Sequence, residues 1–272
     1  MASAKLVNRP KLEEYKGKYK EHLKIERKNG IILLQMHTNG GAVKWSLEMH
    51  NALGQAFHEI GNDPENEVMI LTSTGSTWLG PFDMESADKG ESELSYDLFF
   101  YDTTKLIENL IFDVDIPTIG AVNGPGVHTE IGLMCDLTIC AEEALFSDMH
   151  FVSGMVPGDG QLLAFQGLIG LKRANYATYM GQTIDAKTAL EWGMVNEVLP
   201  SDKLMDRAWE IAETIMQQSR VTRRLTSQLL RRPWKRLLIN DFQVHVAHEL
   251  YHIHKELPKH TNAIFDKAVG KL

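Results

Sequence analysis

The sequence has little of what marks a disulfide-rich, membrane-spanning or nucleic-acid-binding protein. Its 272 residues include two cysteines, Cys135 and Cys140, too few for a disulfide framework. No apolar run reaches the roughly 18–20 residues that span a bilayer, and the first residues lack the apolar core of a signal peptide. The net charge is −8, which does not favour nucleic-acid binding. These absences predict a cytoplasmic protein with reduced thiols.

Hydrophobic residues make up 43% of the chain and charged residues 24%, so a sizeable core is expected. The most basic segment, residues 220–236, alternates arginine with leucine at helical spacing. We interpret it as the solvated face of an amphipathic helix or a subunit contact, ahead of an anion-binding site.

Short apolar segments alternate with helical patterns over the first two hundred residues. Residues 23–38 predict a hairpin that turns at Asn29-Gly30. Residues 67–73 and 116–124 read as buried strands, and helices are expected at 48–60, 95–112 and 160–169. The alternation favours an α/β fold. We expect a core over residues 1–200 and a C-terminal helical region over 201–272 that is broken at Pro233.

The segment "HELYH" matches H-E-x-x-H, in which two histidines one helical turn apart bind zinc and a glutamate acts as base. Its members are His248, Glu249 and His252. The sequence after it, "HIHKELPKH", lacks the glycine of the longer zinc motifs, and Pro258 ends the helix. Two surface imidazoles explain the match better than a metal site, so no metal is predicted.

Other catalytic patterns are missing or incomplete. The chain has no G-x-S-x-G elbow and neither of the glycine-rich phosphate loops. "NGPGVHTE" supplies a helix start at His128 and Thr129 whose backbone N–H groups can stabilise an oxyanion. His150 and Asp159 lie on neighbouring loops, and an Asp–His pair makes a metal-free general base. Asp159 in its P-G-D-G turn is alternatively a simple helix cap.

The segments "IPTIGAVNG", "EIGLMCDLTICAEEALF", "SGMVPGDG" and "GLKRANYATYMGQTIDAKTALEWGMVNEVLP" resemble the crotonase (enoyl-CoA hydratase/isomerase) superfamily in order and spacing. The resemblance implies a repeated ββα spiral core with a C-terminal helical trimerisation region. It covers about residues 23–198, with a plausible helical tail.

The chain departs from the hydratases at the positions that carry their chemistry. The glycine run before the first hydratase glutamate is "GVHTE" here, which keeps Glu130 but introduces His128. The second glutamate is replaced by His150, and the P-G-A-G turn is P-G-D-G, which supplies Asp159. Bulky Pro81 and Phe82 stand where CoA thioesters usually pass.

These departures are similar to the β-diketone hydrolases of the superfamily, typified by oxocamphor hydrolase. The likeness extends to "HTNGGAVKWS" with Trp45 and to "AHE" with Glu249. It implies a hydrolase that cleaves a carbon–carbon bond of 1,3-diketones in a retro-Claisen reaction without CoA, metal or another cofactor. The implied partners are a small-molecule diketone and further copies of the chain, as a trimer or hexamer, with neither nucleic acid nor membrane.

The resemblance also implies roles for individual residues. His150 is the base for water and Asp159 orients it, while His128 and the Trp45 N–H bind the diketone oxygens. Glu249 closes the pocket, Gly80 keeps an oxyanion N–H, and Phe82 and Glu130 line the substrate. Trp45 as a core aromatic, His128 as a polar group at a helix start and Glu249 as a surface residue are the alternatives. A CoA-thioester hydratase, isomerase or thioesterase and a non-catalytic oligomeric binding protein are the other functions considered.

Overall fold

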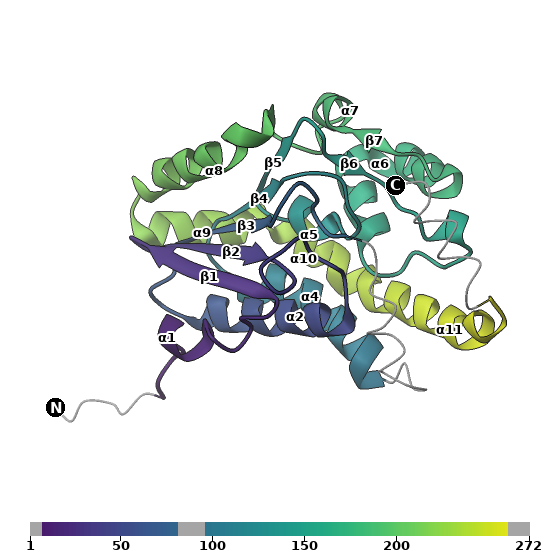
Figure 1. Ribbon diagram of the computed structural model, residues 1–272, viewed down its shortest axis with the longest axis horizontal. Helices are drawn as coiled ribbons and strands as arrows, with labels where there is room; N and C mark the ends of the chain where they lie inside the picture. The colour runs from purple at the N-terminus through teal and green to yellow at the C-terminus, as the bar shows by residue number, and fades with distance from the viewer. Residues whose placement is uncertain (1–6, 81–95, 261–272) are drawn as a thin grey trace.

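The computed structural model describes residues 7–80 and 96–260 and is built on a six-stranded sheet (Figure 1). The strand order is β1-β2-β3-β4-β5-β8. β1 pairs antiparallel with β2, and every later neighbour in this sheet is parallel. The strands are β1 (Leu23–Lys28), β2 (Ile31–Met36), β3 (Val68–Ser73), β4 (Thr118–Val122), β5 (Leu137–Ala141) and β8 (Glu197–Leu199). The expected α/β fold is confirmed.

The hairpin between β1 and β2 forms where the sequence predicts it. Asn29 and Gly30 have φ values of 52° and 83°, the left-handed pair that a tight two-residue turn requires. β3 and β4 are buried at every position, as expected for parallel strands covered on both faces. A second sheet pairs β6 (Leu145–Phe146) with β7 (Ile184–Asp185).

Helices cover both faces of the large sheet. α2 (Leu47–Asn62) begins after Ser46, whose Oγ accepts a hydrogen bond from the Met49 N–H, and packs on one face with α4 (Asp102–Glu108) (Figure 1). α8 (Ser201–Met216) covers the other face. The remaining helical elements are α1 (Leu12–Tyr15), η1 (Tyr96–Tyr101), η2 (Asn109–Asp113), α5 (Glu130–Leu133), η3 (Phe151–Ser153), α6 (Gln161–Met180) and α7 (Ala186–Glu191).

The helix expected to end at residue 169 continues across a kink as α6. Gly170 has φ 77° and ψ 161°, so the chain leaves helical geometry for one residue and then resumes it. A glycine in the sequence does not by itself show whether a helix ends or only kinks there, because glycine is compatible with both.

The C-terminal helices follow as α9 (Arg220–Leu230), α10 (Arg232–Leu237), η4 (Leu238–Phe242) and α11 (Gln243–His260). Pro233 lies in the first turn of α10, where its missing N–H costs no hydrogen bond. α11 then runs outward from η4, and its Val246 packs in the core (Figure 1).

The interpretation of residues 220–236 as a solvated face was wrong for part of the segment. Arg231 is 1% exposed and pairs with Asp136 at 2.7 Å, and Arg223 is also buried and pairs with Glu67. The two ion pairs connect the C-terminal helices to residues beside the sheet, and they neutralise the charges of the buried arginines. The residue spacing within the segment does not reveal these acidic partners.

The structure also describes the two cysteines and the apolar character of the helices. Cys135 and Cys140 are both buried, free thiols. Within residues 7–80 and 96–260, no helix has the length and apolar character needed to cross a membrane.

Candidate active site

Two partly buried histidines and two buried acids from distant parts of the chain meet in one cluster. His128 precedes α5, His150 follows β6, Asp159 precedes α6 and Glu249 lies in α11. Asp159 Oδ2 lies 3.2 Å from His128 Nδ1 and 3.4 Å from His150 Nε2. Glu249 Oε1 lies 3.5 Å from the same His150 nitrogen. The structure thus brings together all four residues to which the resemblance gives catalytic roles.

The glycines of the P-G-D-G turn allow α11 to reach the cluster. A Cβ on Gly158 would lie 2.4 Å from the His245 carbonyl oxygen and 2.5 Å from Glu249 Cβ. Only glycine permits this approach of turn and helix. Asp159 also accepts a hydrogen bond from the Gln161 N–H through Oδ1, at 3.2 Å. Asp159 therefore both accepts this hydrogen bond at the start of α6 and contacts the two histidines.

His128 is held in a left-handed backbone conformation with φ 51°, which is uncommon outside glycine. Its carbonyl accepts a hydrogen bond from Trp78 Nε1 at 3.1 Å, and its Nδ1 lies 2.9 Å from Glu130 Oε1. The Trp45 ring lies 4.3 Å from the His128 ring, centroid to centroid. Trp45 is therefore both a buried aromatic and a wall of the site.

The partners of His150 differ from the sequence-based hypothesis. Its Nδ1 lies 2.9 Å from Asp148 Oδ1, whereas Asp159 and Glu249 face Nε2. Asp159 does not stand behind the ring, where an orienting acid was expected. Asp148 was missed because an acid two residues before a histidine looks like ordinary loop sequence. The "FSDMH" spacing was the available signal.

Burial and mutual attraction perturb the pKa values of the cluster. Burial lowers the pKa of His150, but Asp159, Asp148 and Glu249 outweigh it and hold that pKa well above its usual range. Burial raises the pKa of Asp159, yet the two histidines bring it below its ordinary value. Burial raises the pKa of Glu249 to about 8. Glu249 and His150 therefore titrate as a coupled pair.

A third histidine beside the site, His50, has a lowered pKa, in contrast to His150. His50 packs against Trp45 with ring centroids 5.3 Å apart. Burial, followed by the charge of His128, lowers the pKa of His50 to about 3, so this ring stays neutral. Burial opposes a raised pKa at His128, but Glu130 and Asp159 raise it. The sequence interpretation did not include His50.

Three further residues were predicted to line the site: Gly80, Glu130 and Phe82. Gly80 donates its N–H to the Val43 carbonyl at 3.0 Å, and its role as an oxyanion donor stays a prediction. Glu130 is fully buried beside His128, and burial raises its pKa. Phe82 lies outside the described residues.

The structure does not gather a metal site at "HELYH". His248 is exposed and its Nδ1 lies 2.6 Å from the Val244 carbonyl of its own helix. Among the described residues, the group that could hold a metal is instead His128, Glu130 and Asp159, whose ligand atoms lie within 4.8 Å of one another. Within this group, His128 Nδ1 and Glu130 Oε1 also lie within hydrogen-bonding distance, at 2.9 Å.

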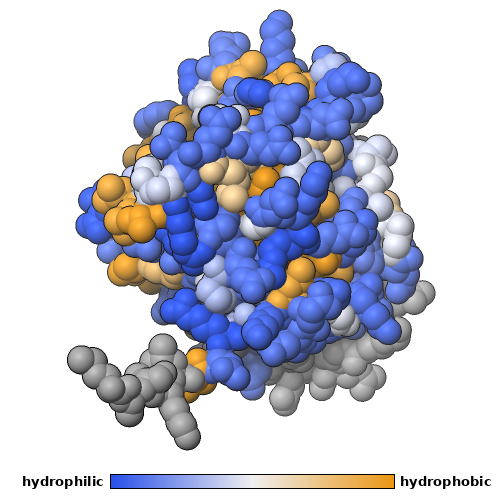
Figure 2. All heavy atoms as spheres, turned by 90° about the vertical axis from the view of Figure 1, so that its left-hand side faces the viewer, coloured by the Kyte–Doolittle hydropathy of each residue, from blue (hydrophilic) through white to orange (hydrophobic). Residues whose placement is uncertain are grey.

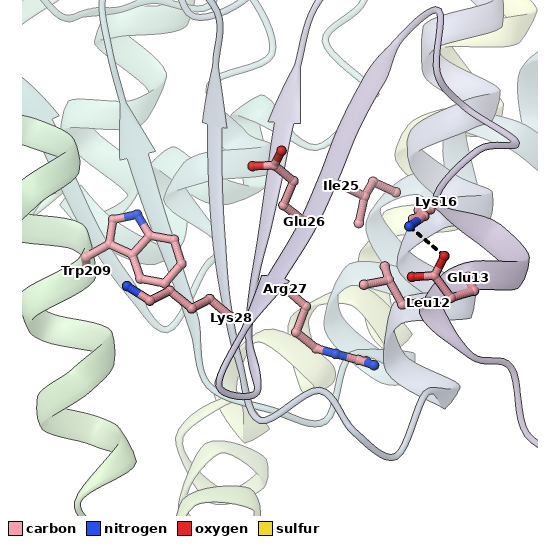
Figure 3. Close-up of a pocket in the computed structure, with 8 residues that line it drawn as sticks. All are labelled: Leu12, Glu13, Lys16, Ile25, Glu26, Arg27, Lys28 and Trp209. Atoms are coloured by element: carbon pink, nitrogen blue, oxygen red, sulfur yellow. Dashed lines mark ion pairs between the residues drawn. The ribbon is translucent and has the colours of Figure 1, made fainter.

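A separate surface depression of about 450 Å³ lies between α1, β1 and α8 (Figure 3). It shares no residue with the histidine cluster. Arg27 on its rim already pairs with Asp63 at 2.7 Å, and Lys16 pairs with Glu13. The catalytic chemistry therefore lies elsewhere.

Comparisons with known proteins place these features in a family. The enoyl-CoA hydratase/isomerase family matches residues 26–265. Carnitinyl-CoA dehydratase of Salmonella enteritidis PT4 is 35% identical over 168 residues, which is 61% of this chain and 63% of the relative. The match therefore spans less than two thirds of that dehydratase.

Two solved structures are similar over nearly the whole fold. A β-diketone hydrolase from the cyanobacterium Anabaena sp. PCC 7120, bound to (S)-3-oxocyclohexyl acetic acid, is 34% identical, with a TM-score of 0.82, over 90% of this chain and 98% of that one. An enoyl-CoA hydratase/isomerase from Mycobacterium paratuberculosis is 20% identical with a TM-score of 0.81 over 93% and 98%, which supports the fold alone. With the matching family and this crotonase architecture, the chain belongs to the enoyl-CoA hydratase/isomerase family.

Proposed function

We propose that this enzyme hydrolyses a carbon–carbon bond of 1,3-diketones and gives a keto acid. The observation that carries the proposal is that one buried carboxylate, Asp159, contacts two partly buried imidazoles at 3.2 and 3.4 Å. Such a pair supplies both functions that a retro-Claisen cleavage needs: a base for water and a donor for the oxygen that becomes negative. The similarity to the Anabaena β-diketone hydrolase supports it.

The reaction begins with water beside His150 and Glu249. The two facing atoms, Nε2 and Oε1, lie 3.5 Å apart, so one water can contact both. This pair takes a proton from water while the water oxygen attacks one carbonyl carbon. The carbonyl electron pair moves to oxygen and forms a tetrahedral oxyanion.

Carbon–carbon cleavage then turns the oxyanion into a carboxylic acid. The electron pair of the broken bond enters the neighbouring ketone as an enolate. His128, whose pKa is raised by Glu130 and Asp159, donates a hydrogen bond to the enolate oxygen. The proton taken from water returns to the enolate carbon, so atoms and charge balance without an external reductant or oxidant.

A CoA-thioester activity is the second candidate, because the Salmonella relative is a carnitinyl-CoA dehydratase. Glu130, the acid retained at a hydratase position, is fully buried and contacts His128 at 2.9 Å. That arrangement commits Glu130 to a histidine rather than leaving it for water addition.

The test is to incubate the purified protein with a cyclic 1,3-diketone and separately with crotonyl-CoA. We expect loss of the diketone absorbance and a keto acid product, and a decrease of about 10²–10⁴-fold in kcat on His150→Ala. Turnover of the thioester alone would contradict the proposal, and activity with neither substrate would favour a non-catalytic binding role. Thr72→Val, which changes a buried hydroxyl of β3, is the control for folding.

We also propose a homo-oligomer built in part through α9. The side of the molecule that carries α8, α9 and β1 is mostly hydrophilic but has separate apolar patches (Figure 2). Val221, Leu225 and Leu229 recur every four residues on α9 and are all more than half exposed. Light scattering after size exclusion tests this, with Leu225→Lys expected to shift the distribution towards monomer.

A further inference from the structure

The charged groups around His150 approach it from opposite sides. Asp148 lies on the Nδ1 side, at 2.9 Å, and Asp159 and Glu249 lie on the Nε2 side, at 3.4 and 3.5 Å. His128, on the loop before α5, adds its charge beyond Asp159. Only one side of the ring can face both water and substrate, so the position of the single proton on the neutral ring matters for catalysis.

Asp148 is held at both of its carboxylate oxygens. It is 1% exposed. One carboxylate oxygen, Oδ1, accepts hydrogen bonds from both the backbone N–H and the Nδ1 side of His150, at 3.1 and 2.9 Å. The other, Oδ2, accepts from Thr178 Oγ1 of α6 at 3.2 Å. Both oxygens are therefore occupied by donors, and neither is free to move toward substrate.

We propose that Asp148, held by Thr178, is a positioning residue that keeps the neutral His150 ring protonated on Nδ1 and leaves Nε2 as the basic nitrogen. An acceptor-only carboxylate at Nδ1 favours the tautomer with hydrogen on that atom. Nε2 then carries the lone pair and points at the acids and water of the reaction. This inference rests on the proposed function, in which His150 is the base.

The arrangement divides the acids by task. Asp148 sets the orientation of the ring from behind. Asp159 lies between the two imidazoles and links their charges. Glu249 exchanges a proton with His150 and the reacting water. The sequence-based hypothesis gives the first task to Asp159, whereas in the structure Asp159 faces Nε2 and Asp148 faces Nδ1.

The first test measures the ring directly and needs no substrate. Protein labelled in its histidine ring nitrogens is studied by NMR at a pH above the titration of His150, with the signal assigned by its loss in His150→Gln. We expect the Nδ1–H tautomer in the wild type and in Thr72→Val. An Nε2–H tautomer in the wild type would overturn the proposal even if the protein cleaved no diketone.

The second test uses kinetics. Asp148→Ala removes the acceptor and should lower kcat by at least about 100-fold while KM stays close to wild type, because a misplaced base loses its alignment. Thr178→Val removes one supporting hydrogen bond and should lower kcat by up to about tenfold, with rescue by Thr178→Ser. Thr72→Val deletes an equally buried hydroxyl in β3 and should leave kcat unchanged.

Asp148→Asn separates charge from orientation. The amide keeps an oxygen for the His150 N–H groups but loses the negative charge that helps to hold the imidazolium. The titration of His150 should move to lower pH, with Asp159, Glu249 and His128 still in place. An unchanged titration, or full kcat in folded Asp148→Ala, would show that Asp148 serves the loop alone. If the wild type cleaves no diketone, the proposed function fails and the NMR result still decides the tautomer.

Discussion

Replacing Glu249 with glutamine removes an ionisable acid from the cluster at almost constant volume. Glu249 is 3% exposed, and burial raises its pKa to about 8. One pH unit below that value, the protonated form exceeds the ionised form by about tenfold. Because Glu249 Oε1 lies 3.5 Å from His150 Nε2, the midpoint belongs to the coupled pair rather than to one residue.

The proposed reaction starts when this pair has lost one proton and can accept one from water. We therefore expect kcat/KM for a cyclic 1,3-diketone to rise about tenfold per pH unit at low pH and to level off above about pH 8. Glu249→Gln cannot ionise. The midpoint of the rise should move away from pH 8, because His150 then titrates without its coupled partner, and the plateau should fall by about 10²–10⁴-fold.

The assay follows loss of the diketone absorbance from pH 5.5 to 9.5, a range set by the need to bracket the pKa of about 8. Glu213→Gln on α8, where the glutamate is exposed, is the matched control and should keep the wild-type profile. Should Glu249→Gln retain a rise with the same midpoint, the titrating group is another one, and the role given to Glu249 is refuted.

Three further outcomes follow from the geometry. Dialysis against EDTA should leave diketone cleavage unchanged; loss of activity that zinc restores would implicate His128, Glu130 and Asp159 as ligands. Gly158→Ala should lower kcat strongly in a folded protein, because its Cβ would lie 2.5 Å from Glu249 Cβ and displace α11; circular dichroism checks the fold. Folded Glu249 keeps a proton between pH 4.5 and about 8 that the unfolded chain releases, so its contribution to stability falls as pH rises through this window. Glu249→Gln should remove a slope on the order of 1 kcal/mol per pH unit, measured by urea unfolding.

Local chemistry made much of the fold predictable from the sequence. Asn29-Gly30 specifies a turn by its own backbone preference, and Ser46 caps α2 through a side chain three residues from its donor. The buried strands β3 and β4 appear as short apolar runs because both of their faces are covered. Each of these features depends on residues that are neighbours in the chain.

Sequence reasoning missed several contacts between residues that are distant in the chain, and one local contact, that of Asp148 with His150. The Gly80 N–H is taken by Val43, which is far from it in sequence, and Arg231 is neutralised by Asp136 on another element. The orienting partner of His150 was assigned to Asp159 because its turn matched a family motif. Motif matching identifies which side chains meet but not which nitrogen each one faces.

The cluster as a whole is suited to keeping one proton available during the reaction. His128 and His150 have raised pKa values and Asp159 has a lowered one, because the carboxylate and the two imidazoles attract one another. Glu249 adds a group that changes charge near pH 8. A retro-Claisen cleavage takes a proton from water early and returns one to carbon late, so the site must hold that proton without losing it to solvent. Burial of Glu249 provides this retention, because its carboxyl group is shielded from bulk water and lies 3.5 Å from His150 Nε2.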